Sequence, residues 1–127
     1  MDNIHFGNAG IEGIDSKFWF VGHFMDKYIG TNKDIRVTSG IEVKWGIHKA
    51  GPLRDKWSIQ HQETSMSILI EGKFRMIYPE KEYVLTRQGD YIIWGPNIPH
   101  KTYADEDCIV LTIRWPSIPE DTKEIQL

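Results

Sequence analysis

Short apolar segments separated by turn residues occupy the chain from residue 18 to residue 115. Residues 41–48 alternate between apolar and polar side chains, with Val43, Trp45 and Ile47 on the apolar parity. This period of two is the pattern of a β-strand with one apolar and one polar face, and we expect the polar face to meet solvent. Further strands are expected at residues 18–25, 66–71, 73–78, 83–86, 91–94 and 109–115.

Turn-forming residues lie between these segments, at Gly51-Pro52, Gly72, Gly89-Asp90 and Gly95-Pro96-Asn97. Short strands divided by such turns, with one weak helical turn near residues 15–18, predict an all-β sandwich or barrel. No linker divides the chain. We therefore expect one domain over residues 1–127, with its core at about 18–116 and an extended tail at 117–127.

Composition restricts the partners of this domain. Of 127 residues, 40% are hydrophobic and 26% charged, and the formal net charge is −3, which is ordinary for a soluble domain. Lys and Arg form no run, so binding to nucleic acid or to a membrane surface is not expected. The start of the chain lacks the pattern of a signal peptide, and Cys108 is the only cysteine, which favours a cytoplasmic protein with a buried thiol.

Two segments resemble the two motifs of the cupin superfamily. Residues 61–72 (HQETSMSILIEG) resemble the first motif, in which histidines and a glutamate precede a strand that ends in glycine. Residues 89–100 (GDYIIWGPNIPH) resemble the second, in which a Gly-Asp turn starts a strand and a Pro-rich turn precedes a histidine. Residues 43–48 and 110–117 are similar to those of small single-domain bacterial cupin-like proteins of undefined function. The resemblance implies a cupin-type double-stranded β-helix, a jelly-roll barrel.

The resemblance also implies a site for a divalent transition metal (Fe, Mn, Ni or Zn) made by three histidines and a glutamate. His61 and His100 occupy two of those positions, whereas Ile59 and Ser65 occupy the other two. If the chain is extended there, Glu63 lies on the same face as His61, because side chains alternate along a strand. His61, Glu63 and His100 are therefore candidate metal ligands. His48, which shares the polar parity of its strand, is an alternative donor, although a surface position suits it equally.

Without a metal, His61 and His100 remain candidate catalytic residues, because imidazole titrates near neutral pH and can transfer a proton. The plainer alternatives are a solvated loop residue for His61 and Glu63, and a structural residue for His100. Candidate contacts to an organic ligand combine flat aromatic faces with polar groups, and they are Trp57, Trp94, Ser65 and Arg54.

Two functions stay open at this point. One is an enzyme that acts on a small metabolite in the barrel mouth, and the other is a non-catalytic module that binds or senses such a ligand. The retained histidines favour the first, and the incomplete set of ligands favours the second. A homodimer is expected in either case, because residues 66–70 are largely apolar and need a cover on each face.

Overall fold

The computed structural model describes residues 3–52 and 56–127. Its secondary structure consists mainly of strands, which confirms the all-β prediction. The strands are β1 (Trp19–Val21), β2 (Glu42–His48), β3 (Gly51–Pro52), β4 (Trp57–Gln60), β5 (Thr64–Glu71), β6 (Phe74–Ile77), β7 (Glu82–Leu85), β8 (Tyr91–Trp94), β9 (Lys101–Ala104), β10 (Cys108–Trp115) and β11 (Thr122–Ile125).

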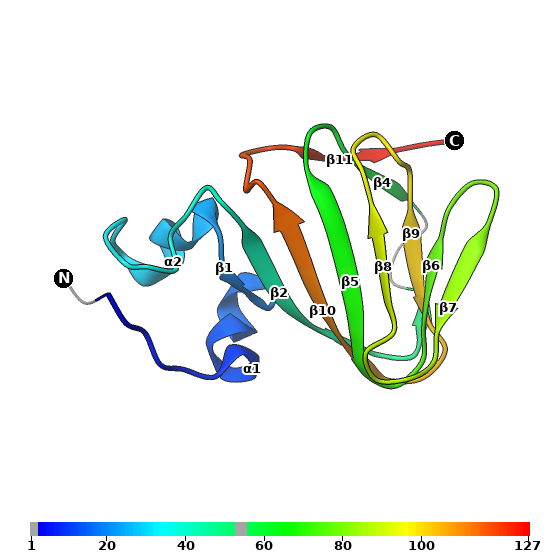
Figure 1. The fold of residues 1–127 in the computed structure, drawn as a ribbon, viewed down its shortest axis with the longest axis horizontal. Coiled ribbons are helices and arrows are strands. Elements are labelled where there is room, and N and C mark those ends of the chain that lie inside the picture. Colours follow the sequence, from blue (N-terminus) through cyan, green and yellow to red (C-terminus); the bar gives the residue numbers. More distant parts are fainter. Residues whose placement is uncertain (1–2, 53–55) are drawn as a thin grey trace.

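The strands form two main sheets and one small one. The larger sheet has the order β1-β2-β10-β5-β8, the second has the order β3-β9-β6-β7, and β11 pairs with β4. The chain crosses from one main sheet to the other between β5 and β6 and again between β7 and β8, so the sheets face each other as in a jelly roll (Figure 1). The strands β8 and β7 are the last members of their sheets and border the same open seam.

Register assigns each strand of the larger sheet an inner and an outer face. On the outer face, one row across the sheet contains Val43, Ile113, Met66 and Ile93. A second row contains Trp45, Leu111, Ile68 and Tyr91. Every one of these side chains is apolar or aromatic, so the outer face presents a broad apolar surface.

The inner face of the same sheet is polar over half its length, which reverses our expectation for β2. Glu42 is only 3% exposed, and Glu42, Lys44 and His48 all line the interior cavity rather than the surface. The alternation along β2 was correctly recognised, but its polar parity points inward. The polar side chains of β2 can lie inside the barrel because they line a cavity, where polar groups keep hydrogen-bonding partners.

The other half of the interior is the hydrophobic core, centred on Leu69, Phe74 and Val110. Gly72 makes the sharp connection between β5 and β6, where φ is +98°. A Cβ there would lie 2.4 Å from the Cβ of Cys108, so this position needs glycine. Cys108 is 3% exposed, as expected for a buried thiol, and burial raises its pKa to about 11.

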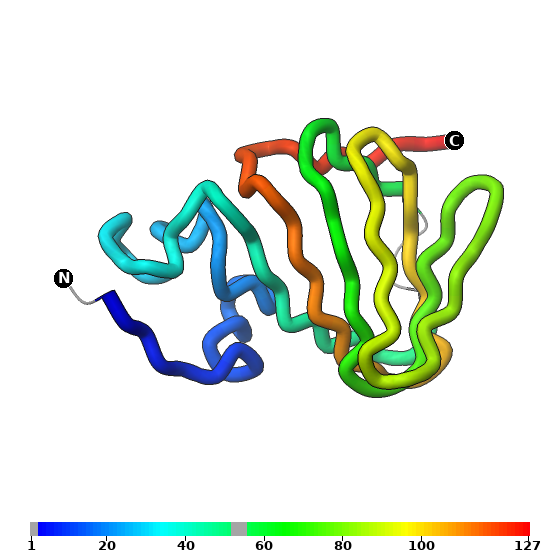
Figure 2. The backbone as a smooth tube through the Cα atoms, viewed as in Figure 1, coloured from blue at the N-terminus to red at the C-terminus, as the bar shows by residue number. Residues whose placement is uncertain are grey.

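The N-terminal segment differs from the prediction in two places. The strand expected at 18–25 ends at Val21, because Gly22 turns the chain into a 3-10 helix at His23–Met25 and the short helix α2 (Asp26–Ile29). The helical turn expected near 15–18 begins earlier, as α1 (Ala9–Glu12) followed by a 3-10 helix at Gly13–Ser16. The segment lies beside β1 at the edge of the barrel (Figure 2). None of the described helices is long and apolar enough to cross a membrane.

The C-terminal tail is extended and paired. Its strand β11 runs antiparallel to β4, with Thr122 opposite Gln60 and Ile125 opposite Trp57. Figure 1 shows this pair across the end of the barrel at which β10 ends. The tail therefore closes one mouth of the interior cavity.

Candidate functional site

The interior cavity has a volume of about 1160 Å³, and residues of the larger sheet and of the tail line it. Its large-sheet wall is polar because of strand register. Arg114 lies opposite Glu42 on one side and Ser65 on the other, and Thr112 lies opposite Lys44 and Ser67. The Ser67 and Thr112 hydroxyls are 3.0 Å apart. This wall offers charges and hydroxyl groups to a small polar ligand.

Two buried carboxyl groups line the cavity where the tail covers it. Glu63 is 1% exposed and Glu42 is 3% exposed. Consecutive residues of the tail hold them: Ser117 Oγ donates to Glu42 Oε2 at 2.8 Å, and the Ile118 N–H donates to Glu63 Oε2 at 2.9 Å. Because one dipeptide binds both groups, the two carboxyls are neighbours.

Burial raises the pKa of Glu63 to about 7, although the hydrogen bond from Ile118 opposes the shift. The negative charge of Glu42 raises the pKa further, whereas the positive charge of Arg114 lowers it. Glu63 Oε1 has no hydrogen-bond partner among the described residues. Glu63 can therefore carry or release a proton near neutral pH, at an oxygen that is open to a new partner.

His23 extends this network toward solvent. Its Nδ1 lies 2.6 Å from Ser117 Oγ, and its backbone N–H donates to the same oxygen at 3.1 Å. Since that hydroxyl already donates to Glu42, His23 Nδ1 is the donor to it. Sequence reasoning did not identify His23, Glu42 or Ser117 as parts of a site.

Besides His23, two histidines line the cavity, and they are His48 and His100. Burial lowers the pKa of each to about 4, and a nearby cation, Lys44 for His48 and Arg114 for His100, lowers it further. His100 Nδ1 lies 3.0 Å from the carbonyl oxygen of Ile98 and donates to it, so Nε2 is the basic nitrogen. Both rings are therefore neutral at pH 7 and are held in place by aromatic contacts, His48 with Phe74 and His100 with Trp94.

The structure does not bring His61 to this site. His61 is exposed, its Nδ1 lies 3.4 Å from Asn97 Oδ1, and it is not among the residues that line the cavity. Our expectation that His61 and Glu63 share a face is wrong, because residues 61–63 form a bend. Asp121 fixes that bend, since its carboxylate accepts hydrogen bonds from the backbone N–H groups of Gln62 and Glu63.

The donor set does not fit the metal that the resemblance implies. In the described part of the chain, no three His, Cys, Asp or Glu side chains cluster closely enough to hold a metal ion. Ile59 and Ser65 stand at two of the expected ligand positions, and His61 points elsewhere. The shifted set of His61, Glu63 and His100 is therefore not assembled.

The residues predicted to contact an organic ligand do not all lie at this cavity. Trp94 is 8% exposed and lines the cavity, but Trp57 does not line it and instead lies under the ammonium of Lys101, 4.6 Å from Nζ to the ring centroid. Ser65 is fully buried, and its Oγ has no hydrogen-bond partner among the described residues. Arg54 lies outside the described residues.

No family model matches the sequence, and no curated protein matches it either. Solved structures do match. An uncharacterised conserved protein with a double-stranded β-helix domain from Klebsiella pneumoniae matches with TM-score 0.60 and 15% identity, over 71% of this chain and 78% of that one. KdgF from Halomonas sp. matches with TM-score 0.53 and 18% identity, over 62% and 72%. Ectoine synthase from P. lautus matches with TM-score 0.53 and 17% identity, over 68% and 67%.

Proposed function

We propose, from the premise that this chain has the double-stranded β-helix fold of the cupins, that it binds a small polar organic molecule in the interior cavity and transfers a proton on it. The fold is shared by enzymes and by proteins without a defined activity, so it does not choose a reaction. The proposal rests on one observation, the buried Glu63 carboxyl with an unpartnered oxygen in the wall of a polar cavity. A buried polar atom without a partner costs about 1–3 kcal/mol, which a bound ligand would recover.

The chain's own residues supply the parts of an acid–base site. Glu63 takes the proton from the ligand and returns it, because its pKa of about 7 keeps both protonation states populated at neutral pH. Neutral His100 accepts a hydrogen bond from the ligand at Nε2 and orients it. Arg114, whose Nη1 lies 3.6 Å from Glu42 Oε1, and Lys44 place cationic groups in the wall, which suits a ligand with a carboxylate or an enolate-like oxygen. The reaction class is an isomerisation, epimerisation or elimination that begins with removal of a proton.

Solvent exchange tests this proposal without knowledge of the product. The protein is incubated in D₂O with sugar acids and hydroxy acids, and ¹H NMR follows the loss of carbon-bound protons. Loss of a proton signal in one compound is expected with the unmodified protein and not with Glu63→Gln. Glu71→Gln, at an exposed glutamate that ends β5, the strand that begins directly after Glu63, is the matched control and should retain exchange. Equal exchange with Glu63→Gln would refute the role of Glu63.

A non-catalytic sensor is the second candidate, and the tail favours it. Ser117 and Ile118 bind the two carboxyls directly, and β11 follows within four residues. A ligand that takes over Glu63 Oε1 would thus act on the segment that closes the cavity. Ligand-dependent thermal stabilisation without any proton exchange would support this candidate over the enzyme.

We also propose that the outer face of the larger sheet pairs with a second copy of the chain. Its two rows of apolar side chains extend across four strands, and Tyr91 and Ile93 are 63% and 51% exposed. An apolar face of this breadth is rare on a monomer's surface. The interface would lie on the opposite side of the sheet from the cavity, so each copy would keep its own site.

A further inference from the structure

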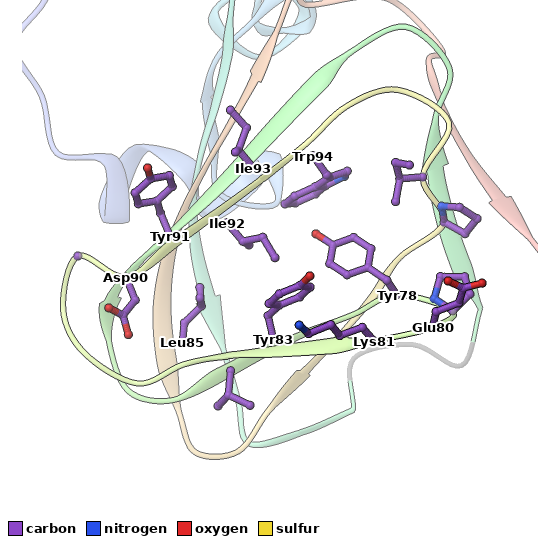
Figure 3. A pocket seen from close by; sticks show the side chains of 15 residues that line it. Tyr78, Glu80, Lys81, Tyr83, Leu85, Asp90, Tyr91, Ile92, Ile93 and Trp94 are labelled. Carbon is purple, nitrogen blue, oxygen red and sulfur yellow. The ribbon is translucent and has the colours of Figure 1, made fainter.

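A second cavity, of about 1090 Å³, occupies the seam between the edge strands β7 and β8. Figure 3 shows it from close by, with Tyr78 and Tyr83 on one side and Ile92 and Trp94 on the other. Leu85 lies between these walls, and the turn after β6 closes one end. Trp94 alone contributes to both this seam cavity and the interior cavity, so its ring separates them.

The walls of the seam cavity are aromatic and already packed in favourable geometry. The rings of Tyr78 and Trp94 meet edge to face, with centroids 6.1 Å apart and planes 69° apart. Tyr78 and Tyr83 meet in the same way at 5.9 Å and 75°. Such preorganised rings offer flat surfaces to a planar ligand at little entropic cost.

Two hydrogen-bond donors in these walls have no partner. Tyr78 Oη and Trp94 Nε1 are both buried and lack a hydrogen bond within the described part of the chain. Trp94 is 8% exposed overall, so water does not readily reach its N–H. Native proteins leave few buried donors unsatisfied, and two beside one cavity indicate groups reserved for something that binds there.

The chemistry of these donors defines the ligand. The indole N–H can only donate, so it requires an acceptor. Burial raises the pKa of Tyr78 well above its usual value, so its hydroxyl stays protonated and can donate to the same acceptor. Charged lining residues occur only at the rim and in both signs: Lys81 lies 4.9 Å from the Tyr83 ring centroid, Glu80 is exposed, and Asp90 accepts hydrogen bonds from the turn before β8. The charges of the lining residues therefore do not favour a ligand with a net charge.

We propose that the seam cavity is a binding site for a flat, uncharged ring compound that carries a carbonyl acceptor. The ring lies against Tyr83 and Ile92, and the carbonyl oxygen accepts hydrogen bonds from Tyr78 Oη and Trp94 Nε1. This site is separate from the one that contains Glu63.

Coumarin, a bicyclic ring with one lactone carbonyl, and naphthalene, a bicyclic ring without an acceptor, are the probes. Each is titrated against the unmodified protein and against Tyr78→Phe, which deletes only the hydroxyl. Tyr78→Phe should weaken coumarin binding by about 2- to 10-fold, the effect of one hydrogen bond, and should leave naphthalene binding unchanged. For each probe, the dissociation constant of the variant is divided by that of the unmodified protein. Because each ratio refers to a single probe, the different hydrophobicity of the two probes cancels. Tyr103→Phe, on β9 and outside the cavity, is the matched control and should change neither.

The indole N–H signal of Trp94 gives a second readout. The chain has five tryptophans, and the signal that disappears in Trp94→Phe assigns this one in a ¹H–¹⁵N spectrum. Coumarin should move it downfield through a new hydrogen bond, and Glu63→Gln should bind coumarin as the unmodified protein does. The proposal is overturned if Tyr78→Phe changes both probes by the same factor or neither, or if coumarin moves other indole signals but not that of Trp94.

Discussion

Replacing Glu63 by glutamine should make the stability of this protein less sensitive to alkaline pH. In the folded chain the pKa of Glu63 is about 7, against an ordinary value of 4.5, because the carboxyl is 1% exposed and lies beside Glu42. The folded state therefore binds this proton more tightly than the unfolded state. The resulting stability is fully present below pH 4.5 and is lost as the pH rises through 7.

The size of this loss follows from the shift. At about 1.4 kcal/mol per pKa unit, the ionisation of Glu63 removes about 3 kcal/mol between pH 4.5 and pH 8. Glutamine keeps an oxygen for the Ile118 N–H and does not ionise. The free energy of unfolding of Glu63→Gln minus that of the unmodified protein should therefore rise by about 3 kcal/mol over this range.

Urea unfolding at a series of pH values measures the difference. The titrations of His48 and His100 occur in both proteins and cancel. Glu71→Gln is the matched control, since it removes an exposed carboxyl at the far end of β5, the strand that begins directly after Glu63, and should give a flat difference. A flat difference for Glu63→Gln as well would show that Glu63 ionises normally, and the acid–base role proposed for it would then fail.

The remaining predictions concern the histidines, the outer face, the core and the metal. His48→Gln should reduce the loss of stability as pH falls from 6.5 to about 4, because folding keeps this ring neutral while the unfolded chain protonates it; acid unfolding curves test this, and an unchanged curve would contradict it. Leu111→Asp should convert a dimer to a monomer in light scattering, whereas Tyr103→Asp on the other sheet should not; a monomeric unmodified protein would refute the proposed interface. Leu69→Ala, at a site with 0% exposure, should cost about 2–5 kcal/mol in urea unfolding, against much less for Ile47→Ala at 43% exposure. Elemental analysis of untagged protein should find no stoichiometric transition metal, and one metal per chain would overturn the judgement that the donor set does not fit.

The fold could be predicted because its longest strands carry strong local signals. The alternation in β2, the apolar runs of β5 and β10, and the Gly-Asp turn before β8 are each visible within a few residues. The strands that were missed, β3, β4, β9 and β11, have two to four residues each, and none of them contains two adjacent large apolar residues such as those of β1, β6, β7 and β8.

The site was harder to predict because tertiary contacts define it. The polarity of β2 shows that its two faces differ, but not that the polar face points inward around a cavity. The bend at His61 depends on Asp121, and the position of Glu42 depends on Ser117, which is 75 residues away in sequence. His100 was found from motif spacing and Glu63 from its alternation with His61, whereas the contacts that tune their protonation come from the tail and from β10.

The consecutive placement of Ser117 and Ile118 has a practical consequence for handling this protein. Ser117 and Ile118 connect the C-terminal tail to Glu42 and Glu63. A force or a bulky fusion at the C-terminus would therefore act on these two carboxyl groups. A purification handle belongs on the N-terminus, which Figure 1 shows on the opposite side of the molecule. Ligand binding can be compared between protein immobilised through its N-terminus and protein immobilised through its C-terminus. A difference would show that the tail is coupled to ligand occupancy.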